Sequence, residues 1–414
     1  MILRTLTRAF TRLWLAQAIS KFGSGITGSA LPLAAVMVLD ATPAQMGLLA
    51  ALGMAPLALI GLVAGAWVDR VRRRPLMVAA DVGRAILLGS IPAAYLLGAL
   101  RFEHLLVVAP LAGTLTVVFD ISYQSLVPEL VGRDQLLRAN SRLATVDATA
   151  EITTPGLAGI FVQAIGAPFA ILLDAASFVA SAVLVALVDV REAARRPTYL
   201  TSSLRREIAD GLRAVMSSPM LRSVAAFNAS RTFFGSFIGA LYALYALREL
   251  GLDPILLGIT IGVGGASNLV GTTLVEPVTR RFGVGPTMLG AMVVGSIAVY
   301  TLPLAGGPVL LAFAILVIGQ ASDAIHPLFD VNALSLRQSI APERVLGRVN
   351  ATMHVIDGGL APIGALVGGF LGGVVGTRET LLIAALGCSV SLLWLIFSPL
   401  RRLRDLPSDI VGSG

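Results

Sequence analysis

The chain has unusually few charged residues. Only 13% of its 414 residues are Asp, Glu, Lys or Arg, whereas an ordinary soluble domain has about 25%. Hydrophobic residues make up 56% of the sequence, and the mean hydropathy is +0.84. A soluble fold could not cover its surface with so few charges. The composition therefore excludes a soluble or disordered protein and predicts that the lipid bilayer is its solvent.

The sequence is also poor in the residues that build disulfides and metal sites. Its single cysteine, Cys388, excludes an intramolecular disulfide. The three histidines, His104, His326 and His354, lie on different segments and lack the spacing of a metal motif. There is no phosphate-binding Gly-Lys-Ser/Thr loop. We therefore expect no metal, no cofactor, no ATP hydrolysis and no enzyme activity.

Apolar stretches separated by short polar breaks predict an all-α integral membrane protein with twelve spanning helices. The predicted spans are 13–38, 46–68, 76–99, 105–130, 141–164, 168–189, 220–247, 255–278, 284–304, 308–332, 348–374 and 379–399. One long polar break divides them six and six. This predicts a bundle over 1–190, a cytoplasmic linker over 191–219, a second bundle over 220–400 and a tail over 401–414. Residues 200–215 of the linker are expected to form an amphipathic surface helix.

The basic residues predict the orientation. The formal net charge is +7, but the arginines do not gather on one soluble face, so we expect no nucleic-acid partner. If both termini are cytoplasmic, nearly all of the 31 Lys and Arg residues fall at cytoplasmic helix ends. The exceptions are Arg101, Arg248 and Arg378, which fall outside, and Lys21, Arg84 and Arg231, which fall within spans.

The two halves of the sequence match each other. Val68-Asp69-Arg70-Val71 recurs as Val275-Glu276-Pro277-Val278. At a constant offset of 210 residues, Phe119-Asp120 matches Phe329-Asp330, Ser125-Leu126 matches Ser335-Leu336, Arg138 matches Arg348, Asn140 matches Asn350, Asp147 matches Asp357 and Gly159 matches Gly369. So many matches in one register indicate a duplication. Two halves of the same topology can rock about a site between them, which is the geometry of alternating access.

The loop after the second predicted span reads Gly65-Ala-Trp-Val-Asp69-Arg70-Val-Arg-Arg73-Arg74. This pattern resembles the signature of the major facilitator superfamily, and the resemblance extends over all twelve spans. Three further segments resemble the bacterial drug, macrolide and siderophore exporters of that superfamily: Ala80-Asp81-Val-Gly-Arg84, Leu126-Val-Pro-Glu-Leu and Asp174-Ala-Ala-Ser-Phe. The exporters' helix-five motif is present at Pro155 and Gly159, while Thr154 departs from it.

The resemblance implies that the first, fourth, seventh and tenth spans line a central cavity, and each of them carries an ionisable residue. On the first span, Lys21 is the only lysine of the chain. A lysine can lose its proton when desolvated and an arginine cannot. This favours a functional role for Lys21, although structural pairing with a carboxylate and snorkelling to the membrane surface are open alternatives.

The tenth span carries Asp323, His326 and Asp330, which share one helical stripe. Pro327 removes a backbone hydrogen bond beside them and is expected to open or kink the helix. The histidine can titrate near neutral pH. The stripe is therefore a candidate proton relay, and a static hydrogen-bonded network is the alternative.

Other charges inside the spans are candidates for substrate or proton binding. Asn228 and Arg231 lie three residues apart on the seventh span, where the arginine could hold a substrate group or pair with a carboxylate. Asp147 and Glu151 lie on one face of the fifth span, where one of them could hold a proton or they could pair with Arg84 or Arg142. Asp81 and Arg84, at i and i+3, are expected to neutralise each other.

We expect a second group of residues to form a cytoplasmic gate. Asp69, Arg70 and Arg73 are placed to pair with Asp120 of the fourth span. Asp330 is the repeat mate of Asp120 and has the same expected role. The remaining gate candidates are Gly65 in the loop signature and Glu276 with Arg280 in the repeated loop.

These features predict a monomeric transporter of the bacterial inner membrane that exports amphiphilic small molecules in exchange for protons. The alternative is a proton-coupled importer of a small metabolite such as a sugar or an organic acid. A membrane-embedded enzyme lacks a catalytic cluster, and a scaffold would leave the intramembrane charges unexplained.

Overall fold

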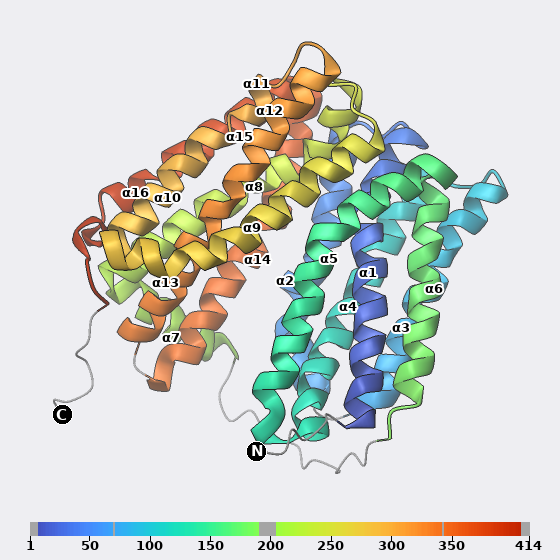
Figure 1. Ribbon diagram of the computed structural model, residues 1–414, viewed down its shortest axis with the longest axis horizontal. Coiled ribbons are helices and arrows are strands. Elements are labelled where there is room, and N and C mark those ends of the chain that lie inside the picture. The colour runs from blue at the N-terminus through green and yellow to red at the C-terminus, as the bar shows by residue number, and fades with distance from the viewer. Residues whose placement is uncertain (1–6, 69–70, 190–203, 342, 407–414) are drawn as a thin grey trace. The chain divides into compact units, whose positions relative to one another are not determined.

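The computed structural model describes residues 7–68, 71–189, 204–341 and 343–406 (Figure 1). Over these ranges the chain is helical and forms no β-strand. Twelve long helical stretches coincide with the twelve predicted spans, and eight stretches among the described residues are long and apolar enough to cross a membrane. The all-α membrane architecture predicted from composition is confirmed.

The first six stretches are single helices. They are α1 (Arg8–Met37), α2 (Pro43–Val68), α3 (Arg73–Leu96), α4 (Phe102–Val131), α5 (Leu136–Ile165) and α6 (Ala167–Ala186), with a 3₁₀ turn, η1 (Arg133–Gln135), before α5.

The second six include three interrupted stretches. The uninterrupted helices are α8 (Pro219–Arg248), α9 (Pro254–Phe282) and α14 (Glu343–Val374). The interrupted stretches are α10 (Val284–Ala298) with α11 (Thr301–Leu304), α12 (Val309–Ala321) with η2 (Ser322–Ile325) and α13 (His326–Ile340), and α15 (Thr377–Ser391) with α16 (Leu393–Ile396). A 3₁₀ turn, η3 (Pro399–Arg402), follows them.

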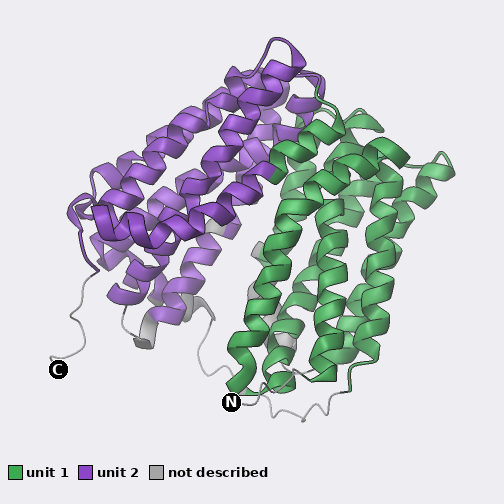
Figure 2. Cartoon of the chain, viewed as in Figure 1, with its two compact units in different colours: residues 1–198, 252–262 green, residues 199–251, 263–414 purple. Residues whose placement is uncertain are grey.

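The chain divides into two compact units (Figure 2). Unit 1 comprises residues 1–198 and 252–262, and unit 2 comprises residues 199–251 and 263–414. Helices α1 to α6 belong to unit 1, and α9 contributes its first residues to unit 1 and the rest to unit 2. The domain limits inferred from the sequence stay predictions.

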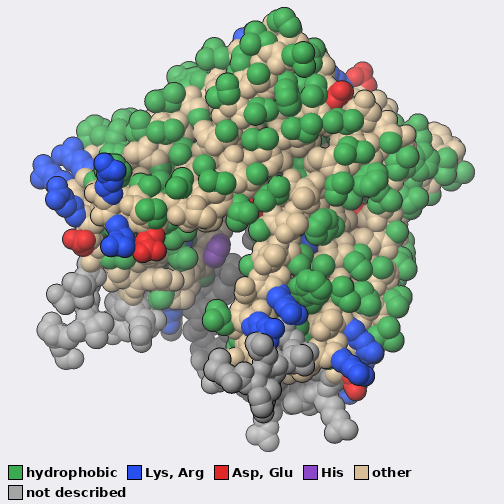
Figure 3. All heavy atoms as spheres, in the orientation of Figure 1, with side chains coloured by type: hydrophobic (Ala, Val, Ile, Leu, Met, Phe, Trp, Pro, Cys, Tyr) green, Lys and Arg blue, Asp and Glu red, His purple; other side chains and the backbone are tan. Residues whose placement is uncertain are grey.

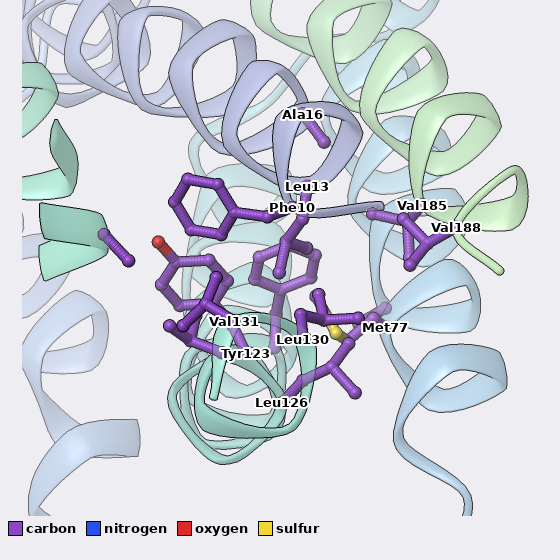
Figure 4. Packing of buried hydrophobic residues seen from close by; sticks show 14 residues of the cluster. Phe10, Leu13, Ala16, Met77, Tyr123, Leu126, Leu130, Val131, Val185 and Val188 are labelled. Carbon is purple, nitrogen blue, oxygen red and sulfur yellow. The ribbon is translucent and has the colours of Figure 1, made fainter. Parts of the chain in front are cut away.

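Each unit has an apolar core built from several helices. In unit 1 the core includes Phe10 and Leu13 of α1, Met77 of α3, Leu126 of α4 and Val185 of α6 (Figure 4). In unit 2 a corresponding cluster includes the rings of Phe227 and Phe329, whose centroids lie 4.8 Å apart. These interdigitating side chains fix the relative positions of the helices within a unit.

The internal repeat is visible in the backbone as well as in the sequence. Phe119 in unit 1 and Phe329 in unit 2, which match at the 210-residue offset, are both buried. Gly166 begins α6 with a φ of 87°, and Gly376, 210 residues later, begins α15 with a φ of 107°. Positive φ favours glycine because the residue lacks Cβ. The same turn is therefore made by the same residue type in both halves.

The tenth predicted span is broken where the sequence predicted it. The helix tightens to the 3₁₀ turn η2 over Ser322–Ile325, and α13 begins at His326 with Pro327 in its first turn. Proline is tolerated there because the first turn of a helix needs no N–H donor. The break places Asp323 in a 3₁₀ turn inside a spanning stretch.

The linker helix also agrees with its prediction. Helix α7 covers Leu204–Ser217 and packs against α14. At Gly211 a Cβ would overlap the hydroxyl of Thr352, and Val215 joins a buried cluster with Val349 and Met353. Helix α7 is therefore an integral part of unit 2.

The outer surface of the helices is largely apolar. Hydrophobic side chains cover most of the face shown in Figure 3, while Lys and Arg side chains gather near helix ends. Exposed large residues include Ile86 of α3, Ile297 of α10 and Ile318 of α12, each at least two-thirds exposed. Such surfaces fit lipid chains.

Close backbone packing generates a stability prediction for α10. The N–H groups of Val284 and Gly285 donate to the carbonyls of Arg404 and Leu403, and a Cβ at Gly285 would overlap the Leu400 carbonyl oxygen. Gly285→Ala should therefore destabilise the protein by about 1–3 kcal/mol. Gly290, on the same helix, has no heavy atom within 4 Å of a Cβ, so Gly290→Ala should be neutral or stabilising, by up to about 1 kcal/mol. Thermal unfolding of detergent-solubilised protein measures both, and equal shifts would contradict the packing assignment.

Candidate functional site

The candidate site residues lie deep within the spanning helices. Lys21, Asp120, Asp147, Arg231 and Asp330 each lie about 15–20 Å along their helices from the end nearest the Arg-rich segments. The hydrocarbon core of a bilayer is about 30 Å thick and helices of 30 residues are about 45 Å long, so these charges lie inside the spanning stretches and away from the helix ends. A charge at that depth needs a partner or water.

In unit 1 the ammonium of Lys21 lies beside a carboxylate of α5. The Nζ atom is 3.7 Å from Oδ1 of Asp147, and the two side chains are 38% and 56% exposed. Lys21 therefore pairs with a carboxylate, which is one of the alternatives that the sequence allowed. Protein does not fully cover this pair. Glu151, one turn further along α5, is exposed.

Asp120 belongs to the same charged group. It is half-buried on α4 and interacts electrostatically with Lys21, Arg84 and Asp147. The sequence predicted Arg73 as its partner, and the structure differs. Arg73 lies at the start of α3, whereas Asp120 lies about 13 Å further along α4 than Glu129, the carboxylate that Arg73 contacts.

The Arg73 side chain is nearly buried at the end of the unit 1 helices. Its Nη1 donates to Oε1 of Glu129 at 2.7 Å and to the Ser125 carbonyl at 3.0 Å. Glu129 was not among the predicted gate residues, although it lies in the Leu126-Val-Pro-Glu-Leu segment that supported the exporter resemblance. Gly65 lies in α2, and Asp69 and Arg70 lie outside the described residues.

The expected pairing of Asp81 with Arg84 is confirmed. The Arg84 guanidinium donates to Oδ1 of Asp81, and the Ser181 hydroxyl of α6 donates to Oδ2 at 2.7 Å. The guanidinium carbon also lies 4.5 Å from the Phe119 ring centroid and 4.0 Å from that of Phe178. Both charged side chains are buried. This pair therefore ties α3 to α4 and α6 inside unit 1.

In unit 2 the charges of the seventh and tenth spans meet. The Nη2 atom of Arg231 is 3.5 Å from Oδ1 of Asp330, and the side chains are 33% and 53% exposed. Of the two roles that the sequence left open for Arg231, the structure shows the pairing with a carboxylate. Two polar atoms on α8, Oδ1 of Asn228 and Nε of Arg231, are buried without a hydrogen-bond partner among the described residues. Such atoms call for water or a ligand.

The predicted stripe on the tenth span adjoins this pair. Nδ1 of His326 is 3.7 Å from Oδ1 of Asp323, and both side chains are about one-third exposed. His326 also interacts electrostatically with Arg231 and Asp330. The structure thus brings four of the predicted site residues of unit 2 into one charged cluster: Arg231, Asp323, His326 and Asp330.

The repeated loop carries a much weaker interaction. Glu276 and Arg280 of α9 form an i,i+4 pair at 3.7 Å with side chains 81% and 80% exposed. A pair this exposed contributes little to stability. It lies within one helix, whereas the contact of Arg73 with Glu129 joins α3 to α4.

Comparison with known proteins identifies the family of the chain. The family described as transmembrane secretion effector matches residues 4–410. The chain is 27% identical to the multidrug efflux pump Tap of Mycolicibacterium fortuitum over 93% of each protein. It is 25% identical to YfiS of Bacillus subtilis strain 168, an uncharacterized MFS-type transporter, over 92% of this chain and 90% of that one.

Solved structures show the same fold. The nucleoside transporter NupG matches with a TM-score of 0.79 at 10% identity, covering 94% of this chain and 99% of NupG. An inward-facing bacterial homologue of the iron transporter ferroportin matches with a TM-score of 0.77 at 19% identity, covering 95% and 99%. The chain belongs to the transmembrane secretion effector family of the major facilitator superfamily, and it is a multi-pass membrane transporter of small molecules.

Proposed function

We propose that this protein exports amphiphilic small molecules across the bacterial inner membrane in exchange for protons. It acts as a monomer by alternating access, with both termini in the cytoplasm. The family membership supports transport, and the similarity to a pump named for multidrug efflux supports the outward direction.

One observation carries the proposal: incompletely buried ion pairs lie between spanning helices in both units. Lys21 with Asp147 and Arg231 with Asp330 are each between one-third and six-tenths exposed. A static structural pair is expected to be enclosed by protein, as Arg84 with Asp81 is. Open pairs leave carboxylates reachable by water, and water-accessible carboxylates inside a membrane are the usual parts of proton pathways.

Asp323 is our first assignment for the coupling proton in unit 2. It lies on the 3₁₀ break, beside His326, and across from Gly264 of α9. Its carboxylate contacts a histidine and not an arginine or a lysine. Protonation of Asp323 therefore leaves no permanently charged partner without a counter-charge. If Asp323 does not bind the coupling proton, Asp147 with Glu151 is the next candidate.

The substrate class follows from what surrounds the charges. The spans are largely apolar, and the polar atoms without partners on α8 belong to Asn228 and Arg231. An amphiphilic molecule satisfies both requirements, since its apolar part replaces lipid and its polar part can bond to these atoms.

We assign the cytoplasmic gate to the segment around Arg73. The contact of Arg73 with Glu129 supports this role, and Gly65, Asp69 and Arg70 complete the assignment from the sequence. Glu276 and Arg280 form the weaker counterpart in the second half.

The proposal predicts that Asp323→Asn separates binding from coupling. The amide mimics a permanently protonated carboxyl, so gradient-driven export should fall by at least about tenfold while substrate binding survives. Export is measured as Hoechst 33342 fluorescence in inverted membrane vesicles with an acidified interior, and binding as Hoechst 33342 titration of purified protein. Glu249→Gln is the control, because Glu249 is exposed at the end of α8.

Two results would count against the proposal in different ways. Wild-type vesicles that move no dye when the pH gradient is imposed would reject proton-coupled export. A wild-type rate for Asp323→Asn would reject only the assignment of the proton to Asp323.

A further inference from the structure

The charged groups of the two units are related by the internal repeat. Lys21 and Arg231 are separated by 210 residues, the same offset that relates Asp120 to Asp330 and Asp147 to Asp357. Each half of the sequence therefore places a cation on its first span and carboxylates on its fourth and fifth spans. Equivalent positions in duplicated halves have equivalent surroundings within their bundles.

Among the described side chains, the cations of the two units contact carboxylates on different spans. In unit 1 the cation contacts the carboxylate of the fifth span, with Lys21 at 3.7 Å from Asp147. In unit 2 the cation contacts the carboxylate of the fourth span of that half, with Arg231 at 3.5 Å from Asp330. The unit 1 counterpart of Asp330 is Asp120, which interacts electrostatically with Lys21.

Neither contact is tight. A charge-assisted hydrogen bond is about 2.7–2.9 Å long, and Arg73 reaches Glu129 at 2.7 Å in the same unit. The Lys21 contact is longer by a full ångström. Lysine carries its charge on four flexible methylenes with three rotatable donors, so its ammonium can turn from Asp147 of α5 towards Asp120 of α4, the other carboxylate with which it interacts.

Carboxylates outnumber cations around Lys21. Helix α1 packs against α4, α5 and α6, which bring Asp120, Asp147 and Asp174 towards it. Asp174 is buried and accepts from the Ser177 hydroxyl. Helix α4 also packs against α2, which has no charged residue, and against α3, whose Arg84 is bound to Asp81. Asp120 also interacts electrostatically with Arg84, whose guanidinium is hydrogen-bonded to Asp81, so Lys21 is the cation that Asp120 and Asp147 share.

We propose that Lys21 exchanges partners between Asp147 and Asp120 during transport, and that a proton binds the carboxylate that the ammonium leaves. The inference rests on the proposed proton-coupled function and adds a second proton position, in unit 1, to that of Asp323. An O–H bond forms on the vacated carboxylate with a proton from water on the acidic side. It breaks when the ammonium returns, and the proton leaves to water on the other side. Lys21 keeps its three protons throughout.

The exchange is tested by neutralising each carboxylate and by swapping the charges of the observed pair. Asp120→Asn and Asp147→Asn should each lower pH-gradient-driven transport of Hoechst 33342 in inverted vesicles by at least about tenfold. Dye counterflow without a gradient should persist, because the amide copies the protonated state. The double variant Lys21→Asp with Asp147→Lys should remain uncoupled, since the relocated ammonium no longer lies between the two carboxylates. Glu103→Gln, exposed on the same helix as Asp120, should behave as wild type.

A static pair makes the opposite predictions. If Lys21 and Asp147 only neutralise each other, Asp120→Asn will transport at the wild-type rate and the charge-swapped variant will recover coupling. Either result overturns the exchange, provided that the wild-type protein is driven by the pH gradient. Absence of that drive in the wild type is instead the failure of the proposed function.

The wild-type chain supplies a second measurement if a variant does not insert. Dicyclohexylcarbodiimide modifies protonated carboxyls in apolar surroundings, and mass spectrometry locates the adducts. The exchange predicts adducts on both Asp120 and Asp147 at acidic pH. Labelling of one of them only, or of neither, overturns it.

Discussion

The structure depends on how the unfavourable free energy of a charge in the hydrocarbon core is offset. An ionised side chain at the bilayer centre costs at least about 2.5–3.5 kcal/mol on insertion scales, and this chain keeps charges inside the spanning stretches of both of its units. They are tolerated because each lies beside an opposite charge: Lys21 beside Asp147, and Arg231 beside Asp330. The packing of the helices has to satisfy these pairs as well as the apolar cores.

The pairs fall into two kinds with different consequences. Arg84 and Asp81 are buried, joined to Ser181 and enclosed by two aromatic rings, so they fix the positions of α3, α4 and α6. The contact between Lys21 and Asp147 is longer, at 3.7 Å, and both side chains are partly exposed. Within one unit, therefore, one pair is enclosed and the other is partly exposed.

The sequence predicted features that are contained within one helix better than contacts between helices. Asp81 and Arg84 share a helix at i and i+3, and Pro327 marks a break in its own span, so periodicity and proline chemistry sufficed. The partner of Arg73 was predicted wrongly, because Asp120 and Glu129 lie on the same helix and only the relative depth of α3 and α4 selects Glu129. The residue pattern of one helix does not give its position along the axis of a neighbouring helix. For the same reason the sequence did not decide the partner of Lys21, because Asp147 lies on a different helix, α5.

The central claim is that substrate movement and proton movement are obligatorily linked, and linkage works in both directions. The most direct measurement uses purified protein in proteoliposomes that contain a pH-sensitive dye and no imposed pH gradient. A gradient of Hoechst 33342 across the membrane should then drive protons in the opposite direction, and the flux should vanish in protein-free liposomes. Dye transport with no accompanying proton flux would contradict the account.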